Sequence, residues 1–169
     1  MDTTTKQHAQ KQTASSDQTR ITSFKWDPSV CSILPPLYLR QGLTQKHMDA
    51  IYLVSHYLFE QKKYREACPL FEMMTFLDCY DKRAWLGTAA CFEAMKEYPV
   101  AAGCYKCAAL LDESDPMPFF RSFNCYLGYN DKAQAMSALE AAIEIAGKQE
   151  GLYSSLKEQA IKLKEVLLK

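Results

Sequence analysis

The sequence predicts an all-α protein assembled from a repeated pair of helices. Three observations support this fold class. Matching residues recur at an interval of 34 positions, nearly every segment after about residue 45 has helical composition and spacing, and capping residues stand at the breaks between these segments. We therefore expect helical hairpins that stack on one another.

The composition is that of an ordinary globular domain. The chain has 169 residues, of which 48% are hydrophobic and 24% charged, and its 20 basic and 20 acidic side chains cancel. This balance disfavours nucleic-acid binding, which usually needs a basic excess. No apolar run approaches the roughly 18 residues that span a bilayer, and the first twenty residues lack the apolar core of a secretory signal. We therefore expect a cytoplasmic protein that does not insert into membranes.

The N-terminal part divides into two segments before the helices begin. Residues 1–25 are rich in Thr, Gln and Ser and poor in apolar groups, which predicts a disordered arm. Residues 26–45 are more apolar but are interrupted by Pro35 and Pro36. These prolines favour a short helix or a docked arm over a long helix.

Residues 46–149 contain the repeat. Two helices in 34 residues are the signature of the tetratricopeptide repeat, and three copies span residues 48–81, 82–115 and 116–149. The fold class is thus an all-α, helical-hairpin solenoid of three repeats. The four aligned columns are Ala67, Ala101 and Ala135; Phe71, Tyr105 and Leu139; Ile51, Trp85 and Phe119; and Leu58, Phe92 and Tyr126.

These columns have a physical reason, because one hairpin is too small to bury its own apolar face and stacking buries it. The alanine column marks the place where two helices approach closely. Predicted helix ends are the N-caps Asp81, Asp115 and Asp131, and a C-terminus at Gly147. Residues 150–169 form one capping helix over the last hairpin. Its apolar side chains are at positions 152, 156, 160, 163 and 167.

The first helix of each hairpin lines the inner, concave face of such a stack. Its inward positions carry apolar and aromatic side chains with a few polar groups between them, which predicts a groove for an extended peptide with apolar anchors, prolines among them. The candidate groove residues are Tyr52, His56, Phe59, Arg83, Leu86, Ala90, Glu93, Phe120, Asn124 and Leu127, with Asp49 and Met117 at equivalent positions. In the alternative interpretation, Tyr52, Phe59 and Phe120 are core residues under the N-terminal arm or the last helix.

No arrangement of residues indicates an enzyme, a cofactor or a metal site. The three histidines at 8, 47 and 56 do not form a ligand cluster, and there is no phosphate-binding loop or nucleophile–base pair. The seven cysteines stand mostly beside alanines and aromatics, where free thiols act as small hydrophobes. Cys104 and Cys107 have the spacing of a redox pair, but no βαβ pattern surrounds them, so a redox function is the weaker alternative.

One stretch carries a more specific pattern, L-D-x-Y-D-x-R-x-x-L-G-x-x-A-C. It consists of Leu77, Asp78, Tyr80, Asp81, Arg83, Leu86, Gly87, Ala90 and Cys91. This core, with the surrounding residues 45–146, resembles the class II chaperones of bacterial type III secretion, the SycD/LcrH family of translocator chaperones.

The resemblance implies a specific function. Members of the family are cytoplasmic chaperones with three tetratricopeptide repeats, and they keep two hydrophobic translocator proteins soluble and apart before export. A translocator segment bearing Pro and Leu lies in the groove. Tyr52, Phe59, Leu86 and Phe120 match the groove positions of the family, whereas His56 departs from the aromatic carbocycle that is common there. The resemblance also allows a homodimer through the N-terminal region.

A general repeat scaffold that joins folded proteins is the alternative function. Such a scaffold would use the convex or end surfaces and would not need an aromatic groove. Replacing Tyr52 and Phe120 by alanine would leave its partners bound.

Overall fold

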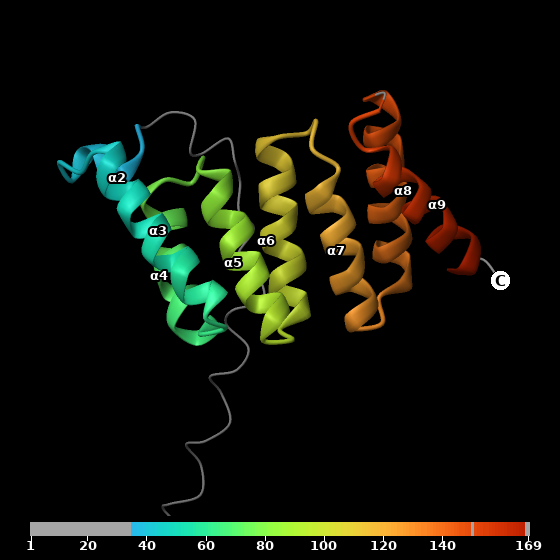
Figure 1. Cartoon of the computed structure of the whole chain (residues 1–169), viewed down its shortest axis with the longest axis horizontal. Coiled ribbons are helices and arrows are strands. Elements are labelled where there is room, and N and C mark those ends of the chain that lie inside the picture. Colours follow the sequence, from blue (N-terminus) through green and yellow to red (C-terminus); the bar gives the residue numbers. More distant parts are fainter. Residues whose placement is uncertain (1–34, 150, 168–169) are drawn as a thin grey trace, which may run out of the picture. The chain divides into compact units, whose positions relative to one another are not determined.

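The computed structural model describes residues 35–149 and 151–167, and within them every regular element is an α-helix (Figure 1). This confirms the predicted all-α class. The predicted disordered arm, residues 1–25, and the first part of the segment 26–45 lie outside the described residues. The described remainder of that segment contains one short helix, α2 (Leu37–Arg40).

Seven longer helices follow α2 and form three hairpins and a final helix. Each of them packs against the next along the chain, from α3 to α9 (Figure 1). The first hairpin is α3 (Gln45–Glu60) with α4 (Tyr64–Leu77), the second α5 (Lys82–Ala94) with α6 (Tyr98–Leu111), and the third α7 (Met117–Gly128) with α8 (Lys132–Lys148), before α9 (Ser154–Leu167). None of these helices is both long and apolar enough to cross a membrane.

The three hairpins are built alike in their cores. The alanines of the predicted column, Ala67, Ala101 and Ala135, are all fully buried. Because protein interiors are close-packed, a larger side chain at these positions would push the two helices apart. The next column, which contains Phe71, Tyr105 and Leu139, is buried as well.

The turn inside each hairpin has the same backbone conformation. Lys62, Lys96 and Asn130 have φ angles of 59°, 65° and 64°, and they stand one repeat apart. A left-handed residue lets the chain reverse within three residues, although it costs about 1–2 kcal/mol for a side chain other than glycine. The period of the sequence therefore extends to its turns.

Two of the three predicted N-caps, Asp81 and Asp131, are confirmed, whereas the N-cap of α7 is Pro116. Asp81 and Asp131 accept hydrogen bonds from the backbone N–H of Arg83 and Gln134 at 3.0 and 3.1 Å. Asp115 accepts from the N–H of Met117 at 2.9 Å, one residue ahead of the helix boundary at Pro116.

The predicted helix end at Gly147 is confirmed to within one residue, because α8 ends at Lys148. Lys148 forms an ion pair with Glu144, one turn earlier, at 2.8 Å. Such an i,i+4 pair adds a small stabilisation to the last turn of α8.

Polar links join successive hairpins. Arg83 donates to Asp49 of the preceding hairpin at 3.1 Å. Lys82 donates at 2.7 Å to Asp115, which leads into α7, and also at 2.7 Å to Asp112 at the end of its own hairpin. The Gln149 amide donates to the backbone oxygen of Ser114. These links add polar contacts to the apolar packing between the hairpins.

The last helix, α9, covers α8, as predicted for a capping helix. Its Ala160 is fully buried, and Leu156 and Leu163 are half-buried. Lys164 adds an ion pair with Glu140 of α8 at 2.7 Å. Leu152 precedes the helix and is 72% exposed, and Leu167 is exposed at its end, so these two of the five predicted apolar positions do not face α8.

Candidate functional site

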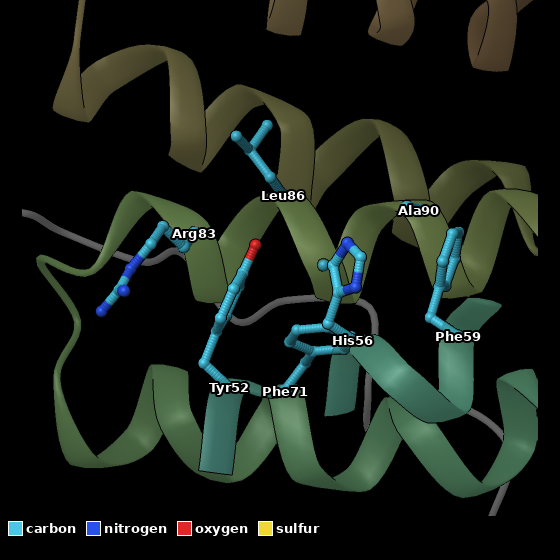
Figure 2. A pocket seen from close by; sticks show the side chains of 8 residues that line it. Tyr52, His56, Phe59, Phe71, Arg83, Leu86 and Ala90 are labelled. Carbon is cyan, nitrogen blue, oxygen red and sulfur yellow. The ribbon is translucent and has the colours of Figure 1, made fainter. Parts of the chain in front are cut away.

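A cavity of about 210 Å³ lies between the first and second hairpins (Figure 2). Its walls come from α3 and α5, and one residue of α4 forms its bottom. The lining residues are Tyr52, His56 and Phe59 of α3, Phe71 of α4, and Arg83, Leu86, Gly87 and Ala90 of α5. We call this cavity the α3–α5 pocket.

The α3–α5 pocket brings together six of the ten candidate groove residues. They come from α3 and α5 because inward positions recur every three or four residues on each helix and the two helices lie side by side. The six are Tyr52, His56, Phe59, Arg83, Leu86 and Ala90. Two further lining residues, Phe71 and Gly87, were not predicted. Phe71 was assigned to the core because it belongs to a core column. Gly87 could have been predicted, because a glycine in the middle of a helix is unusual.

Half of the residues that line the pocket have aromatic rings. The ring of Tyr52 meets the ring of Phe71 edge-on, with centroids 6.1 Å apart and planes at 68°. The ring centroids of His56 and Tyr52 lie 5.9 Å apart. The Phe59 ring packs edge-on against the Tyr64 ring, with centroids 5.2 Å apart. Edge-on aromatic pairs are favourable and restrict ring motion, so the apolar wall is preformed.

The rim of the pocket is polar and is dominated by Arg83. Its guanidinium donates to Asp49 and to both carboxylate oxygens of Asp81, at 2.9–3.1 Å, and stacks over the ring of Tyr52 (Figure 2). The hydrogen bonds from Arg83 to the Asp81 carboxylate raise the pKa of Arg83, and this effect is larger than the lowering caused by burial. The Gln45 amide and then the Arg83 guanidinium lower the pKa of the Asp49 carboxyl. Arg83 is therefore a fixed cation whose charge two carboxylates balance.

The His56 side chain stands on the open side of the pocket. Its Nε2 atom lies 3.9 Å from a carboxylate oxygen of Glu60, one turn further along α3, and both side chains are more than half exposed. An imidazole here adds a hydrogen-bonding group next to the apolar rings of Phe59 and Phe71.

The other four candidate residues do not line the α3–α5 pocket. Glu93 accepts a hydrogen bond from the Tyr105 hydroxyl at 2.6 Å and lies 3.8 Å from Arg121. Phe120 packs on Phe123 and the core of the third hairpin, with ring centroids 6.0 Å apart. Asn124 and Leu127 are exposed on α7. Their part in binding stays a prediction.

The titratable groups in the described parts of the chain include thiols of α6 that lie outside the α3–α5 pocket. No group of three His, Cys, Asp or Glu in these described parts could hold a metal ion. Burial raises the pKa of the Cys104 thiol to about 12 and that of Cys107 to about 11. Thiols of this kind are poor nucleophiles near neutral pH.

Comparison with known proteins places the chain in a family. No protein-family model matches it. It is 33% identical over 123 residues to the low calcium response locus protein H of Yersinia pestis, and the match covers 70% of this chain and 73% of that protein. The chain belongs to the SycD/LcrH family of type III secretion chaperones.

Solved structures of SycD/LcrH chaperones share its fold. PcrH of Pseudomonas aeruginosa, in complex with the chaperone binding region of PopD, is 27% identical, with a TM-score of 0.70 over 75% of this chain and 95% of that one. SycD of Yersinia enterocolitica, in complex with a peptide of the translocator YopD, is 27% identical, with a TM-score of 0.68 over 73% and 94%. The same SycD has also been solved as an alternative dimer.

Proposed function

We propose that this protein is a cytoplasmic chaperone of a bacterial type III secretion system and that it binds hydrophobic translocator proteins through an extended segment in the α3–α5 pocket. The observation that carries the proposal is the pocket itself, a preformed aromatic cavity with a balanced cation at its rim. Two relatives in the family, PcrH and SycD, form complexes with translocator segments.

The pocket suits one apolar side chain of an extended segment. Phe59, Phe71 and Leu86 offer apolar surface, and burying a Leu-sized side chain stabilises a complex by about 1.5–3 kcal/mol. Association itself costs at least about 4 kcal/mol. A single anchor is therefore not sufficient, and a bound segment must make further contacts.

Those further contacts fall on the inner positions of α5 and α7. Glu93 can accept a backbone N–H of the bound segment through its second carboxylate oxygen, Asn124 is exposed and can both donate and accept, and Leu127 offers apolar surface. A segment bearing Pro and Leu fits this series, because proline keeps it extended and lowers the entropy that binding removes. Several weak contacts of this kind give a complex that can be taken apart.

Release of the cargo needs another component. The sequence holds no phosphate-binding loop of the GxxxxGK type, so the chaperone is not powered by nucleotide hydrolysis at such a loop. We propose a non-enzymatic escort that keeps translocators soluble and apart until the export machinery removes them. A homodimer of free chaperone is consistent with this proposal, because a dimer of SycD is known.

The proposal is tested by fluorescence anisotropy with a labelled, Pro- and Leu-bearing translocator peptide. Tyr52→Ala removes a pocket wall, and Phe76→Ala is the matched control because Phe76 is 74% exposed on α4 and does not line the pocket. We expect saturable binding that Tyr52→Ala weakens and Phe76→Ala leaves unchanged. Equal binding by the wild type and Tyr52→Ala would favour the scaffold alternative, in which partners use other surfaces.

A further inference from the structure

Gly87 stands in the middle of α5, where the ring of Phe71 meets that helix. A Cβ atom added to Gly87 would lie 2.7 Å from Cγ of Phe71 and still closer to Cδ1 and Cε1. Carbon atoms do not approach one another so closely, so no side chain fits at position 87 while Phe71 keeps its place. Because glycine weakens a helix relative to alanine, its presence here calls for a reason, and the close approach of the ring supplies one.

The Phe71 ring has free space on one side only. It is 2% exposed, and behind it lies a close-packed core. In front of it lies the α3–α5 pocket, where Figure 2 shows Phe71 between Tyr52 and His56. The other members of the buried cluster that contains Phe71 are Met48, Ala67, Cys68, Met74, Ala84 and Cys91. A side chain at position 87 would therefore displace the ring, and we expect the ring to move toward the pocket, where there is free space.

The next repeat has no such arrangement. One period later, Phe71 is replaced by Tyr105 and Gly87 by Arg121. Glu93 joins these two, accepting from the Tyr105 hydroxyl at 2.6 Å and lying 3.8 Å from Arg121. A polar bridge thus occupies the second interface at the positions where a phenylalanine and a glycine frame a cavity at the first.

We propose that Gly87 sets the depth of the α3–α5 pocket by leaving the space in which Phe71 lies, and so acts as a positioning residue for cargo. The inference rests on the proposed function and deepens it. With Phe71 held back, the bottom of the pocket is an aromatic ring, and Phe59 and Leu86 form apolar walls beside it. The occupant is therefore an uncharged, apolar side chain of the bound segment.

The test is Gly87→Ala, measured with the same labelled peptide by anisotropy. We expect binding to weaken at least tenfold while the helical circular dichroism spectrum is kept. Gly103→Ala is the matched control, because Gly103 is also in mid-helix, on α6, and no heavy atom lies within 4 Å of its added Cβ. We expect Gly103→Ala to bind as the wild type does.

A second variant separates positioning from simple loss of structure. In the double variant Phe71→Leu/Gly87→Ala, a smaller side chain gives way to the new methyl group, and we expect most of the affinity to return. This variant also keeps the test decisive if Gly87→Ala alone does not fold. If the double variant binds the peptide no better than Gly87→Ala does, the inference is wrong. The same holds if Gly87→Ala is unfolded and the double variant still does not bind.

A crystal structure of the Gly87→Ala protein provides a measurement that does not need cargo. We expect the Phe71 ring to be displaced toward Tyr52 and His56 and the pocket to be smaller. If the ring moves but the wild type binds no translocator peptide, the proposed function fails and the inference about pocket depth stands. If the ring stays in place, or Gly87→Ala binds peptide as the wild type does, the inference is wrong.

Discussion

The guanidinium carbon of Arg83 lies 4.9 Å from the centroid of the Tyr52 ring, directly over its face. The same guanidinium bonds to Asp49, one repeat earlier, and to Asp81, which caps its own helix. Arg83 thus connects two hairpins, a helix start and a pocket wall. Its removal should affect stability and binding together.

Arg83→Met should lower both the free energy of unfolding and the affinity for peptide. The side chain is 43% exposed, so solvent screens its ion pairs, and we expect the cation–π contact and the pairs together to contribute about 1 kcal/mol. Urea unfolding and peptide anisotropy measure the two effects. Arg65→Met, a change of the same kind at an exposed position of α4, should alter neither. Equal values for wild type and Arg83→Met would show that the stacked geometry has no energetic effect.

The N-cap of α5 should affect the pocket in addition to the helix. Asp81→Ala removes the acceptor of the Arg83 N–H and also a partner of the Arg83 guanidinium. Asp131→Ala removes the corresponding acceptor at the start of α8, far along the chain from the pocket. Each variant should lose about 1 kcal/mol of stability in urea unfolding.

Only Asp81→Ala should also weaken peptide binding, since the freed guanidinium no longer stays over Tyr52. A loss of affinity in Asp131→Ala of the same size would mean that binding follows overall stability, and the local explanation would fail.

Much of this fold was predictable because its signals are local and periodic. The alanine column, the caps at Asp81 and Asp131, and six pocket residues all follow from spacing within single helices. The bottom of the pocket was not predictable in this way. Phe71 belongs to a core column and was therefore predicted to be buried. Whether a buried ring also borders a cavity depends on the residue that faces it from another helix.

The same limit applies to the second interface but not to one helix end. The link from Tyr105 to Glu93 depends on side chains of α5 and α6 that meet only after the hairpins have stacked. Gly147 has the residue type of a helix stop, and α8 ends one residue after it, at Lys148. The residue type at one position does not show whether contacts within a helix or contacts between helices will determine the local structure.

The bond between Lys82 at the start of α5 and Asp112 at the end of α6 should make stability depend on pH in the acid range. The Lys82 ammonium holds the pKa of Asp112 at about 2, below its ordinary value of 3.8. A lowered carboxyl pKa contributes stability that is present above about pH 4 and lost as the pH falls toward 2. Burial lowers the pKa of Lys82, but its bonds to Asp112 and Asp115 outweigh burial and raise it.

Lys82→Met should therefore be less stable than the wild type at pH 7, by about 1 kcal/mol, and the difference should shrink as the pH falls from 4 to 3. Urea unfolding at a series of pH values measures it. Lys46→Met, at an exposed position of α3, should show no difference that varies with pH. A gap between wild type and Lys82→Met that stays constant down to pH 3 would contradict the role given to Asp112.

The cysteines of α6 should react slowly in the folded protein. Burial raises the pKa of Cys107 from 9.0 to about 11, and that of Cys104 to about 12. Because only the thiolate reacts, a rise of two pKa units lowers the reactive fraction at pH 8 by about 100-fold. Iodoacetamide labelling, mapped by mass spectrometry, should thus modify these two cysteines far more slowly in native protein than in urea.

The same raised pKa values predict the effect of alkaline pH. The unfolded thiols ionise first, so the contribution of Cys104 and Cys107 to stability is complete below about pH 9 and is lost as the pH rises toward 11–12. Cys107→Ala should flatten this alkaline loss and leave peptide binding unchanged, because Cys107 does not line the α3–α5 pocket. Rapid native labelling of both cysteines, or loss of binding in Cys107→Ala, would restore the redox alternative that the Cys104–Cys107 spacing raises.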